Sequence, residues 1–134
     1  MKALKVDHLG IAVRDLDAAV RAYRALGFEV ESVHDVPTEK VRVAFLPVGE
    51  SRLELLEPTA ADSAIGRFLE KRSGLHHVCL LVADIEAALA ELKAAGVELI
   101  DERPRPGAGG SRVAFLHPRA GAGVLLELKE APRR

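Results

Sequence analysis

The sequence lacks the features that would assign it to several classes of protein. It contains a single cysteine, Cys79, and no tryptophan, asparagine or glutamine. One cysteine excludes an internal disulfide and fits a reducing compartment, so we expect a cytoplasmic protein in which Cys79 is a small buried hydrophobe. The absence of both amide residues is a pattern that thermophilic proteins favour, although GC-rich coding produces the same pattern.

Neither sign of charge dominates, and no long apolar run is present. The 134 residues include 19 Lys and Arg and 20 Asp and Glu, which gives a formal net charge of −1. Without a basic block we expect no nucleic-acid partner. No apolar run approaches the roughly 18 residues that span a bilayer, and the start does not read as a secretion signal, so we expect no membrane association. We predict one domain, residues 1–134.

What the sequence does contain is a segment that occurs twice. Residues 6–13 carry His8 and return as residues 75–82, which carry His77 at an offset of 69 positions. The same offset relates five further pairs: Asp15 and Asp84, Ala18 and Ala87, Ala19 and Ala88, Gly27 and Gly96, and Glu29 and Glu98.

The later part of each half repeats as well. The run Arg42–Leu46 returns as Arg112–Leu116, and each half closes with one glutamate in an apolar run, Glu54 and then Glu127. The chain is therefore a duplicated module with one matched histidine and one matched glutamate per copy.

Each copy predicts one helix at the same place. Residues 15–27 carry an apolar stripe at helical spacing, with Asp15 as the N-cap and Gly27 as the stop. The second copy repeats this pattern between Asp84 and Gly96.

Strands complete each module, so that each half reads β-α-β-β-β. Runs rich in valine, leucine and phenylalanine predict strands at 28–36, 40–48, 51–57, 97–102, 112–117 and 123–130. The fold class is then α+β, with modules at about 5–57 and 75–130. A linker, 58–74, carries a short helix within 62–72.

One loop of the second module is conspicuous. Residues 103–110 contain two prolines and three glycines, which forbid helix and discourage strand. No Gly-Lys-Ser/Thr follows, so this is not a nucleotide-phosphate loop. Nearby arginines could place an anionic substrate group, or they could simply be solvated: Arg103, Arg105, Arg112 and Arg119.

Strand alternation separates the histidines. His77 shares a face with Cys79, whereas His76 points the other way. A glutamate among leucines, such as Glu54, is usually a solvent-facing residue of a half-exposed sheet. Matched pairs in both copies instead favour a divalent metal site on a pseudo-twofold axis, because imidazole and carboxylate together suit Zn²⁺, Co²⁺, Ni²⁺ or Mn²⁺.

The same residues carry a family resemblance. The chain resembles, nearly end to end, the vicinal oxygen chelate superfamily, which includes glyoxalase and bleomycin-resistance proteins, and within it the methylmalonyl-CoA epimerase family. The loop 103–110 followed by Phe-Leu-His-Pro is more specific to that family than the histidine and glutamate quartet. The stretches concerned are His8–Val13, Glu54–Pro58, Asp62–Ser63, Phe68–Arg72, Gly74–His77, Asp101–Gly110, Val113–Pro118 and Gly123–Leu128.

The resemblance implies a fold, a metal and a reaction. The two modules would form one curved, largely antiparallel sheet around a metal-containing cavity. His8, His77 and Glu127 would hold the ion, with Glu54 as the fourth ligand. Co²⁺ is favoured, and Mn²⁺, Ni²⁺ or Zn²⁺ would also suit. The reaction would interconvert (R)- and (S)-methylmalonyl-CoA, a step that links propionate-type catabolism to succinyl-CoA.

The resemblance also suggests roles for individual residues. Glu127 is the first choice for the catalytic carboxylate, and Glu54 is its counterpart. Some relatives carry a glutamate early in the third strand that is proposed as a base. This chain has Arg42 near that position, and Glu39 lies close by on the preceding turn. Residues implied in acyl-CoA binding are Gly109, Gly110, Arg112, His117 and Arg119. A homodimer is expected by resemblance alone.

Other functions of the same superfamily stay open at this point. A glyoxalase I-like lactoylglutathione lyase would use the same quartet, although the long loop argues against it. A metal-free, drug-sequestering binding protein would not need the four ligands. A dioxygenase with two histidines and one carboxylate is a further option, which ligation by Glu54 disfavours.

Overall fold

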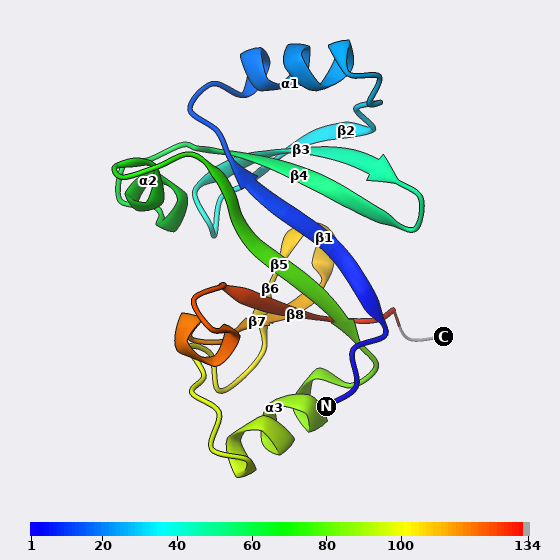
Figure 1. The fold of residues 1–134 in the computed structure, drawn as a ribbon, viewed down its shortest axis with the longest axis vertical. Helices are drawn as coiled ribbons and strands as arrows, with labels where there is room; N and C mark the ends of the chain where they lie inside the picture. Colours follow the sequence, from blue (N-terminus) through cyan, green and yellow to red (C-terminus); the bar gives the residue numbers. More distant parts are fainter. Residues whose placement is uncertain (133–134) are drawn as a thin grey trace. The chain divides into compact units, whose positions relative to one another are not determined.

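A computed structural model describes residues 1–132, and its strands and helices pack into two units (Figure 1). One unit comprises His8–His76. The other combines Met1–Asp7 with the described residues from His77 onward. The strands β1 (Lys5–Ala12) and β5 (Gly74–Val82) therefore each begin in one unit and end in the other. Among the described residues, no helix is long and apolar enough to cross a membrane.

The unit His8–His76 is a sheet covered by a helix. After β1 come α1 (Leu16–Ala25), β2 (Ser32–Val36), β3 (Val41–Val48), β4 (Ser51–Pro58) and α2 (Ala64–Leu69). The strand order is β2-β3-β4-β1, in which β4 and β1 are parallel and the other neighbours are antiparallel. Helix α1 lies over this sheet (Figure 1). Its apolar stripe closes a core of Leu16, Val20, Ala44, Leu46 and Leu55.

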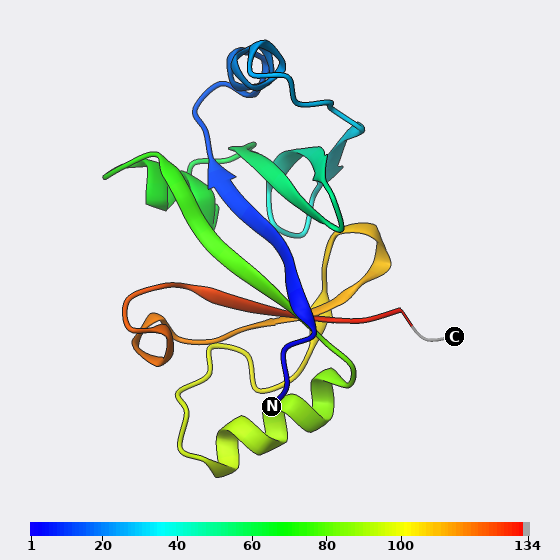
Figure 2. The ribbon, with the colours of Figure 1, turned by 45° about the vertical axis from the view of Figure 1, so that its right-hand side comes forward.

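The second unit repeats this plan. After β5 come α3 (Ile85–Ala94), β6 (Arg105–Pro106), a 3-10 turn (Ala108–Gly110), β7 (Arg112–Phe115), a 3-10 turn (Pro118–Gly121) and β8 (Leu126–Glu130). The strand order is β5-β8-β7-β6, with β5 and β8 parallel. Helix α3 packs on β7 and β8, and Figure 2 shows it crossing beneath these strands. The core contains Val82, Ile85, Ala88, Leu89, Ala114, Leu116 and Leu128.

The structure confirms a β-α-β-β-β order in each half and both predicted N-caps. Asp15 Oδ1 accepts a hydrogen bond from the backbone of Ala18 at 3.1 Å, and Asp84 Oδ1 accepts one from Ala87 at 3.0 Å. Gly27 and Gly96 follow their helices with φ of +101° and +80°, which explains the stop signals.

The predicted strand 28–36 is wrong over its first residues. Phe28 N–H bonds to the Tyr23 carbonyl and the two rings stack edge to face at 5.5 Å, so this segment caps the helix instead of joining the sheet. Pairing with β3 starts with the bond from Glu31 N–H to the Phe45 carbonyl, and β2 begins at Ser32.

The predicted strand 97–102 is also wrong, since only the bridge between Leu99 and Leu116 forms there. The side chain of Asp101 accepts the Phe115 backbone N–H at 2.8 Å, a bond that a regular ladder would direct to a backbone carbonyl. The ladder resumes at Arg105–Pro106, so part of the segment predicted as a pure loop forms the short strand β6.

Two matched glutamates, Glu57 half-buried and Glu130 buried, tie the last strand of each unit to its helix. Glu57 Oε2 accepts the backbone N–H of Leu16 at 2.7 Å, and Glu130 Oε2 accepts that of Ile85 at 3.1 Å. The other oxygen of each glutamate faces an arginine of the repeated Arg-Val-Ala-Phe-Leu run: Arg42 at 3.5 Å and Arg112 at 3.2 Å. The repeated arginine therefore has a structural partner in both copies.

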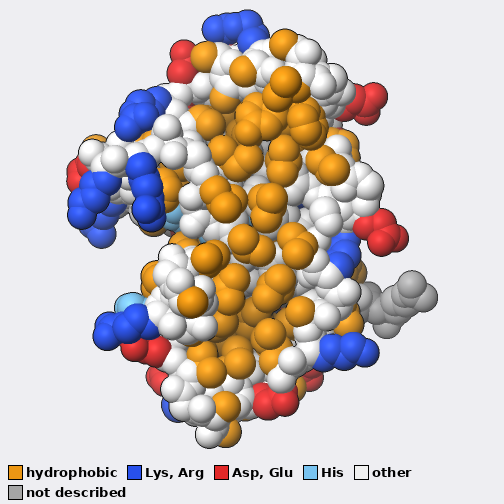
Figure 3. Space-filling view, viewed as in Figure 1, with side chains coloured by type: hydrophobic (Ala, Val, Ile, Leu, Met, Phe, Trp, Pro, Cys, Tyr) orange, Lys and Arg blue, Asp and Glu red, His pale blue; other side chains and the backbone are white. Residues whose placement is uncertain are grey.

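Each unit also exposes apolar side chains. Figure 3 shows hydrophobic side chains gathered on the face of each unit that Figure 1 presents, while most charged side chains lie toward the edges. Large exposed hydrophobic residues are Leu26, Val33, Val48 and Leu75 in one unit, and Met1, Leu4, Val6, Ile100 and Val124 in the other.

Candidate metal centre

The first unit holds a buried histidine and carboxylate side by side. In the parallel pairing of β1 and β4, Gly10 lies opposite Glu54. His8 is two residues before Gly10 and therefore presents its side chain on the same face as Glu54. His8 Nδ1 lies 3.2 Å from Glu54 Oε2, and the two residues are each 5% exposed.

The second unit repeats the pair with its own strands. Cys79 of β5 lies opposite Glu127 of β8, and His77 precedes Cys79 by two residues. His77 Nε2 lies 3.1 Å from Glu127 Oε1, and both residues are buried. The His77 ring also stacks edge to face on Phe115 at 5.9 Å, which fixes its plane.

The chemistry of these donors fits a divalent ion. Each pair offers an imidazole nitrogen and a carboxylate oxygen, the ligand types that Zn²⁺, Co²⁺, Ni²⁺ and Mn²⁺ accept. A carboxylate this deeply buried is costly unless a cation or several donors face it. The sequence-predicted residues His8, Glu54, His77 and Glu127 thus occur as two matched pairs, one in each unit.

An arginine that the sequence argument did not select lies against one of these pairs. Arg52 Nε donates to Glu54 Oε2 at 2.8 Å, and its guanidinium lies 4.8 Å from the ring centroid of Phe45. The signal was present in the sequence, because Arg52 precedes Glu54 by two residues and therefore shares its face of β4.

His76 has a different environment from His77. Its ring packs edge to face on Phe68 of α2 at 4.9 Å. In strand β5 the two consecutive histidines therefore contact different groups, one an aromatic ring and the other a carboxylate.

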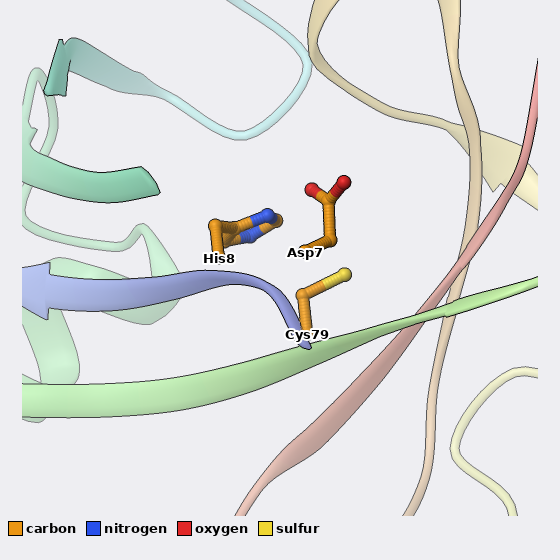
Figure 4. A group of neighbouring side chains, drawn as sticks. All are labelled: Asp7, His8 and Cys79. Atoms are coloured by element: carbon orange, nitrogen blue, oxygen red, sulfur yellow. The ribbon is translucent and has the colours of Figure 1, made fainter. Parts of the chain in front are cut away.

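Two further residues with ligand-type side chains lie at the start of β1 and in β5. Figure 4 shows Asp7 and Cys79 together with His8, the residue that follows Asp7. A carboxylate oxygen of Asp7 and Cys79 Sγ lie within 4.8 Å of each other. Asp7 Oδ2 also lies 3.4 Å from Lys129 Nζ, so an internal cation already compensates this carboxylate. Cys79 is 0% exposed, as expected of a small buried hydrophobe.

The glycine-rich segment turns sharply. Gly109 and Gly110 have φ of +68° and +75°, values that side-chain-bearing residues rarely adopt. Gly107 N–H bonds to the Ser111 carbonyl, and a Cβ at Gly107 would meet Ser111 and Val113 at 2.8 Å. The two glycines predicted to contact substrate therefore lie at the exposed tip of a closed turn.

The other predicted substrate contacts are engaged with carboxylates of their own unit. Arg112 pairs with Glu86 at 3.0 Å and with Glu130 at 3.2 Å. His117 Nε2 and Arg119 Nε each lie 3.5 Å from Glu98, and His117 Nδ1 accepts the backbone N–H of Arg119. The Arg119 side chain is 76% exposed.

Comparison with known proteins places these features in context. The model of the Glyoxalase/Bleomycin resistance protein/Dioxygenase superfamily matches residues 7–115. The mitochondrial methylmalonyl-CoA epimerase of Mus musculus is 40% identical over 130 residues, 95% of this chain and 73% of that protein. The ethylmalonyl-CoA/methylmalonyl-CoA epimerase of Cereibacter sphaeroides is 42% identical over 130 residues, 94% of this chain and 97% of that protein.

A solved structure is also similar along nearly the whole chain. A methylmalonyl-CoA epimerase in complex with methylmalonyl-CoA and NH4+ has a TM-score of 0.92 and 43% sequence identity. The match covers 97% of this chain and 96% of that one.

Proposed function

Because this chain belongs to the glyoxalase/bleomycin resistance protein/dioxygenase superfamily, we propose that it is a methylmalonyl-CoA epimerase, an isomerase that interconverts (R)- and (S)-methylmalonyl-CoA. The observation that carries the proposal is identity of 40–43% to epimerases over at least 94% of the chain. Both histidines lie beside buried carboxylates, and these side chains together supply the ligand types that a metal-dependent enzyme of the superfamily would need.

The proposed metal ligands are His8, His77 and Glu127, with Glu54 as the fourth. The ion, for which Co²⁺ is our first choice, would supply Lewis acidity toward the negative charge that develops on the thioester oxygen. Burial of the four side chains excludes water from them, which strengthens their electrostatic interactions.

The protein's own carboxylates would move the proton. One carboxylate removes the proton from C2 of the substrate, and the electron pair left behind delocalises onto the thioester oxygen. An acid on the opposite face then returns a proton to C2, which inverts the centre. We assign one of these roles to Glu127 and the counterpart role to Glu54. Glu39, which is half-buried on the turn before β3, is the alternative second base.

The acyl-CoA would lie along the glycine-rich turn. Gly109 and Gly110 offer an exposed backbone without side chains, which permits close approach of a ligand. Arg112, His117 and Arg119 are the proposed cationic and hydrogen-bonding contacts. Of these, Arg119 is the most exposed and best placed to exchange Glu98 for a phosphate.

The proposal extends to assembly and cellular role. The apolar side chains exposed on each unit support a homodimer, since patches of this kind mark protein interfaces. Light scattering after size-exclusion chromatography tests it, and a monomer at micromolar concentration would contradict it. We place the enzyme in the cytoplasm and in propionate metabolism.

Deuterium uptake tests the reaction directly. Cobalt-loaded protein in D₂O is incubated with methylmalonyl-CoA, and uptake at C2 is followed by NMR or mass spectrometry. We expect rapid exchange that requires metal and is lost in His8→Ala. Absence of exchange with folded, metal-loaded protein would reject the epimerase, and turnover of a glutathione hemithioacetal would then assign glyoxalase chemistry.

One observation favours a second substrate. The Cereibacter sphaeroides relative is named for both ethylmalonyl-CoA and methylmalonyl-CoA. The same exchange assay with ethylmalonyl-CoA tests whether this chain shares that breadth.

A further inference from the structure

The two histidine–carboxylate pairs differ in one neighbouring residue, although the modules that carry them are copies of each other. Glu54 and Glu127 are equivalent residues, and the residue two positions earlier is Arg52 in the first copy and Leu125 in the second. A charged side chain thus accompanies the carboxylate in one module where a neutral one stands in the other. The difference is built into the sequence, on the strand that carries the carboxylate.

Arg52 contacts both Glu54 and Phe45. In register it lies opposite His8 on β1, so Arg52, His8 and Glu54 share one face of the sheet. Its guanidinium stacks over Phe45, which itself lies opposite Glu54 on β3. Because the stacked guanidinium is already ordered, its hydrogen bond to the carboxylate costs little further side-chain entropy.

Both groups converge on a single oxygen of Glu54. Arg52 Nε lies 2.8 Å from Oε2, and His8 Nδ1 lies 3.2 Å from the same atom. These contacts fix the rotation of the carboxylate about its terminal bond, which is otherwise soft. Oε1 is thereby the oxygen that Glu54 would present to a metal or a proton.

We propose that Arg52 is a positioning residue that fixes the orientation of Glu54 and so gives the two carboxylates of the duplicated site different roles. Its catalytic part rests on the proposed reaction, whereas its metal-binding part rests only on the proposed ligation by Glu54. The substrate is itself unsymmetrical, with a carboxylate and a thioester on C2, so unequal carboxylates suit it better than identical ones.

A double-mutant cycle tests the proposal without relying on turnover. Co²⁺ alone is titrated into wild type, Arg52→Leu, Glu54→Ala and the double variant. Removal of an outer partner of a metal ligand typically weakens metal binding by about 10- to 100-fold. Loss of the positive charge of Arg52 would by itself favour Co²⁺ binding. This effect is small, because the Arg52 side chain is 31% exposed and its charge is screened by solvent. We therefore expect at least about tenfold weaker binding in Arg52→Leu.

The cycle separates action through Glu54 from other roles. If Arg52 acts through Glu54, its replacement in the Glu54→Ala background changes Co²⁺ affinity by no more than about twofold. An undiminished effect in that background, unchanged affinity in Arg52→Leu, or tighter binding would each overturn the proposal. Arg21→Leu, an exposed change on α1 in the same unit, is the matched control and should leave affinity unchanged.

Kinetics supply the second measurement. In Arg52→Leu we expect kcat for C2 exchange to fall by about tenfold or more with KM nearly unchanged, and Arg52→Lys to recover part of the loss because it keeps the charge but not the planar fork. A raised KM with full kcat would assign Arg52 to substrate binding and overturn the proposal. If wild type shows no exchange, the proposed function fails, and the cobalt titrations still decide the role of Arg52.

Discussion

Glu130, the last residue of β8, accepts a hydrogen bond from the backbone N–H of Ile85, the first residue of α3, at 3.1 Å. Its second oxygen lies 3.2 Å from Arg112 Nη1. The strand that carries Glu127 is therefore attached to the start of the helix that covers the unit's core. Because the same attachment joins Glu57 to Leu16, the duplication preserved this framework along with the histidine–carboxylate pair.

Removal of this attachment should destabilise the protein. Glu130→Ala leaves an unsatisfied N–H at a helix start and a cation without its buried partner, so we expect the free energy of unfolding to fall by about 2–4 kcal/mol. Urea denaturation measures the change. Glu86→Ala removes the exposed partner of Arg112 and should cost no more than about 0.5 kcal/mol. Equal losses of unfolding free energy in the two variants would show that the buried bond stabilises the fold no more than the exposed ion pair does.

The consecutive histidines should respond very differently to alanine substitution. His77→Ala removes a proposed ligand and should lose most bound metal and activity, while the fold persists because each unit has its own apolar core. His76→Ala removes the contact with Phe68 but no proposed ligand, and should be mild. Metal content by mass spectrometry and thermal unfolding report both effects. Stoichiometric metal in His77→Ala, or its loss in His76→Ala alone, would contradict the ligand assignment.

Arg119 should affect substrate affinity alone. Its side chain is mostly exposed and its contact with Glu98 is long, so Arg119→Ala should leave unfolding unchanged. If it contacts a phosphate of the acyl-CoA, KM should rise by roughly three- to tenfold with kcat retained, and the rise should shrink at high salt. Arg24→Ala, an exposed change on α1, serves as the control. An unchanged KM at low salt would remove Arg119 from the binding site.

A left-handed alanine offers a test on stability. Ala122 follows the 3-10 turn Pro118–Gly121 with φ of +54°, a conformation that favours glycine. Ala122→Gly should therefore raise the free energy of unfolding by up to about 1 kcal/mol. Ala120→Gly, within the turn, should lower it instead. Thermal or urea unfolding distinguishes them, and a destabilised Ala122→Gly would contradict the backbone assignment.

The sequence predicts the parts of the fold that depend on local chemistry. Asp15 and Asp84 cap their helices because the first N–H groups of a helix lack intrahelical acceptors, and an aspartate at this position supplies one. The offset between His8 and His77 predicts two equivalent pairs, and the structure contains such a pair in each unit. Metal ligation by these residues stays a prediction.

What the sequence did not reveal depends on side chains that compete with the backbone or meet across strands. Asp101 takes the N–H that would have extended a strand through 97–102, and nothing in its neighbours along the chain indicates this. The arginine partners of Glu57 and Glu130 come from a different strand, so pairing of those strands must be known first. Arg52 is the exception, because strand alternation alone places it on the same face of β4 as Glu54.

The division of β1 between two units has a consequence for synthesis of the chain. Asp7 contacts Lys129, a residue 122 positions later, and Leu4 N–H bonds to the Leu81 carbonyl. Leu4 and Asp7 thus acquire these native neighbours only after Leu81 and Lys129, respectively, have been synthesised. Residues 8–76 can assemble early, whereas the other unit combines residues 1–7 with residues from 77 onward and therefore has a high contact order. Its formation is therefore expected to be the slow, late event of folding.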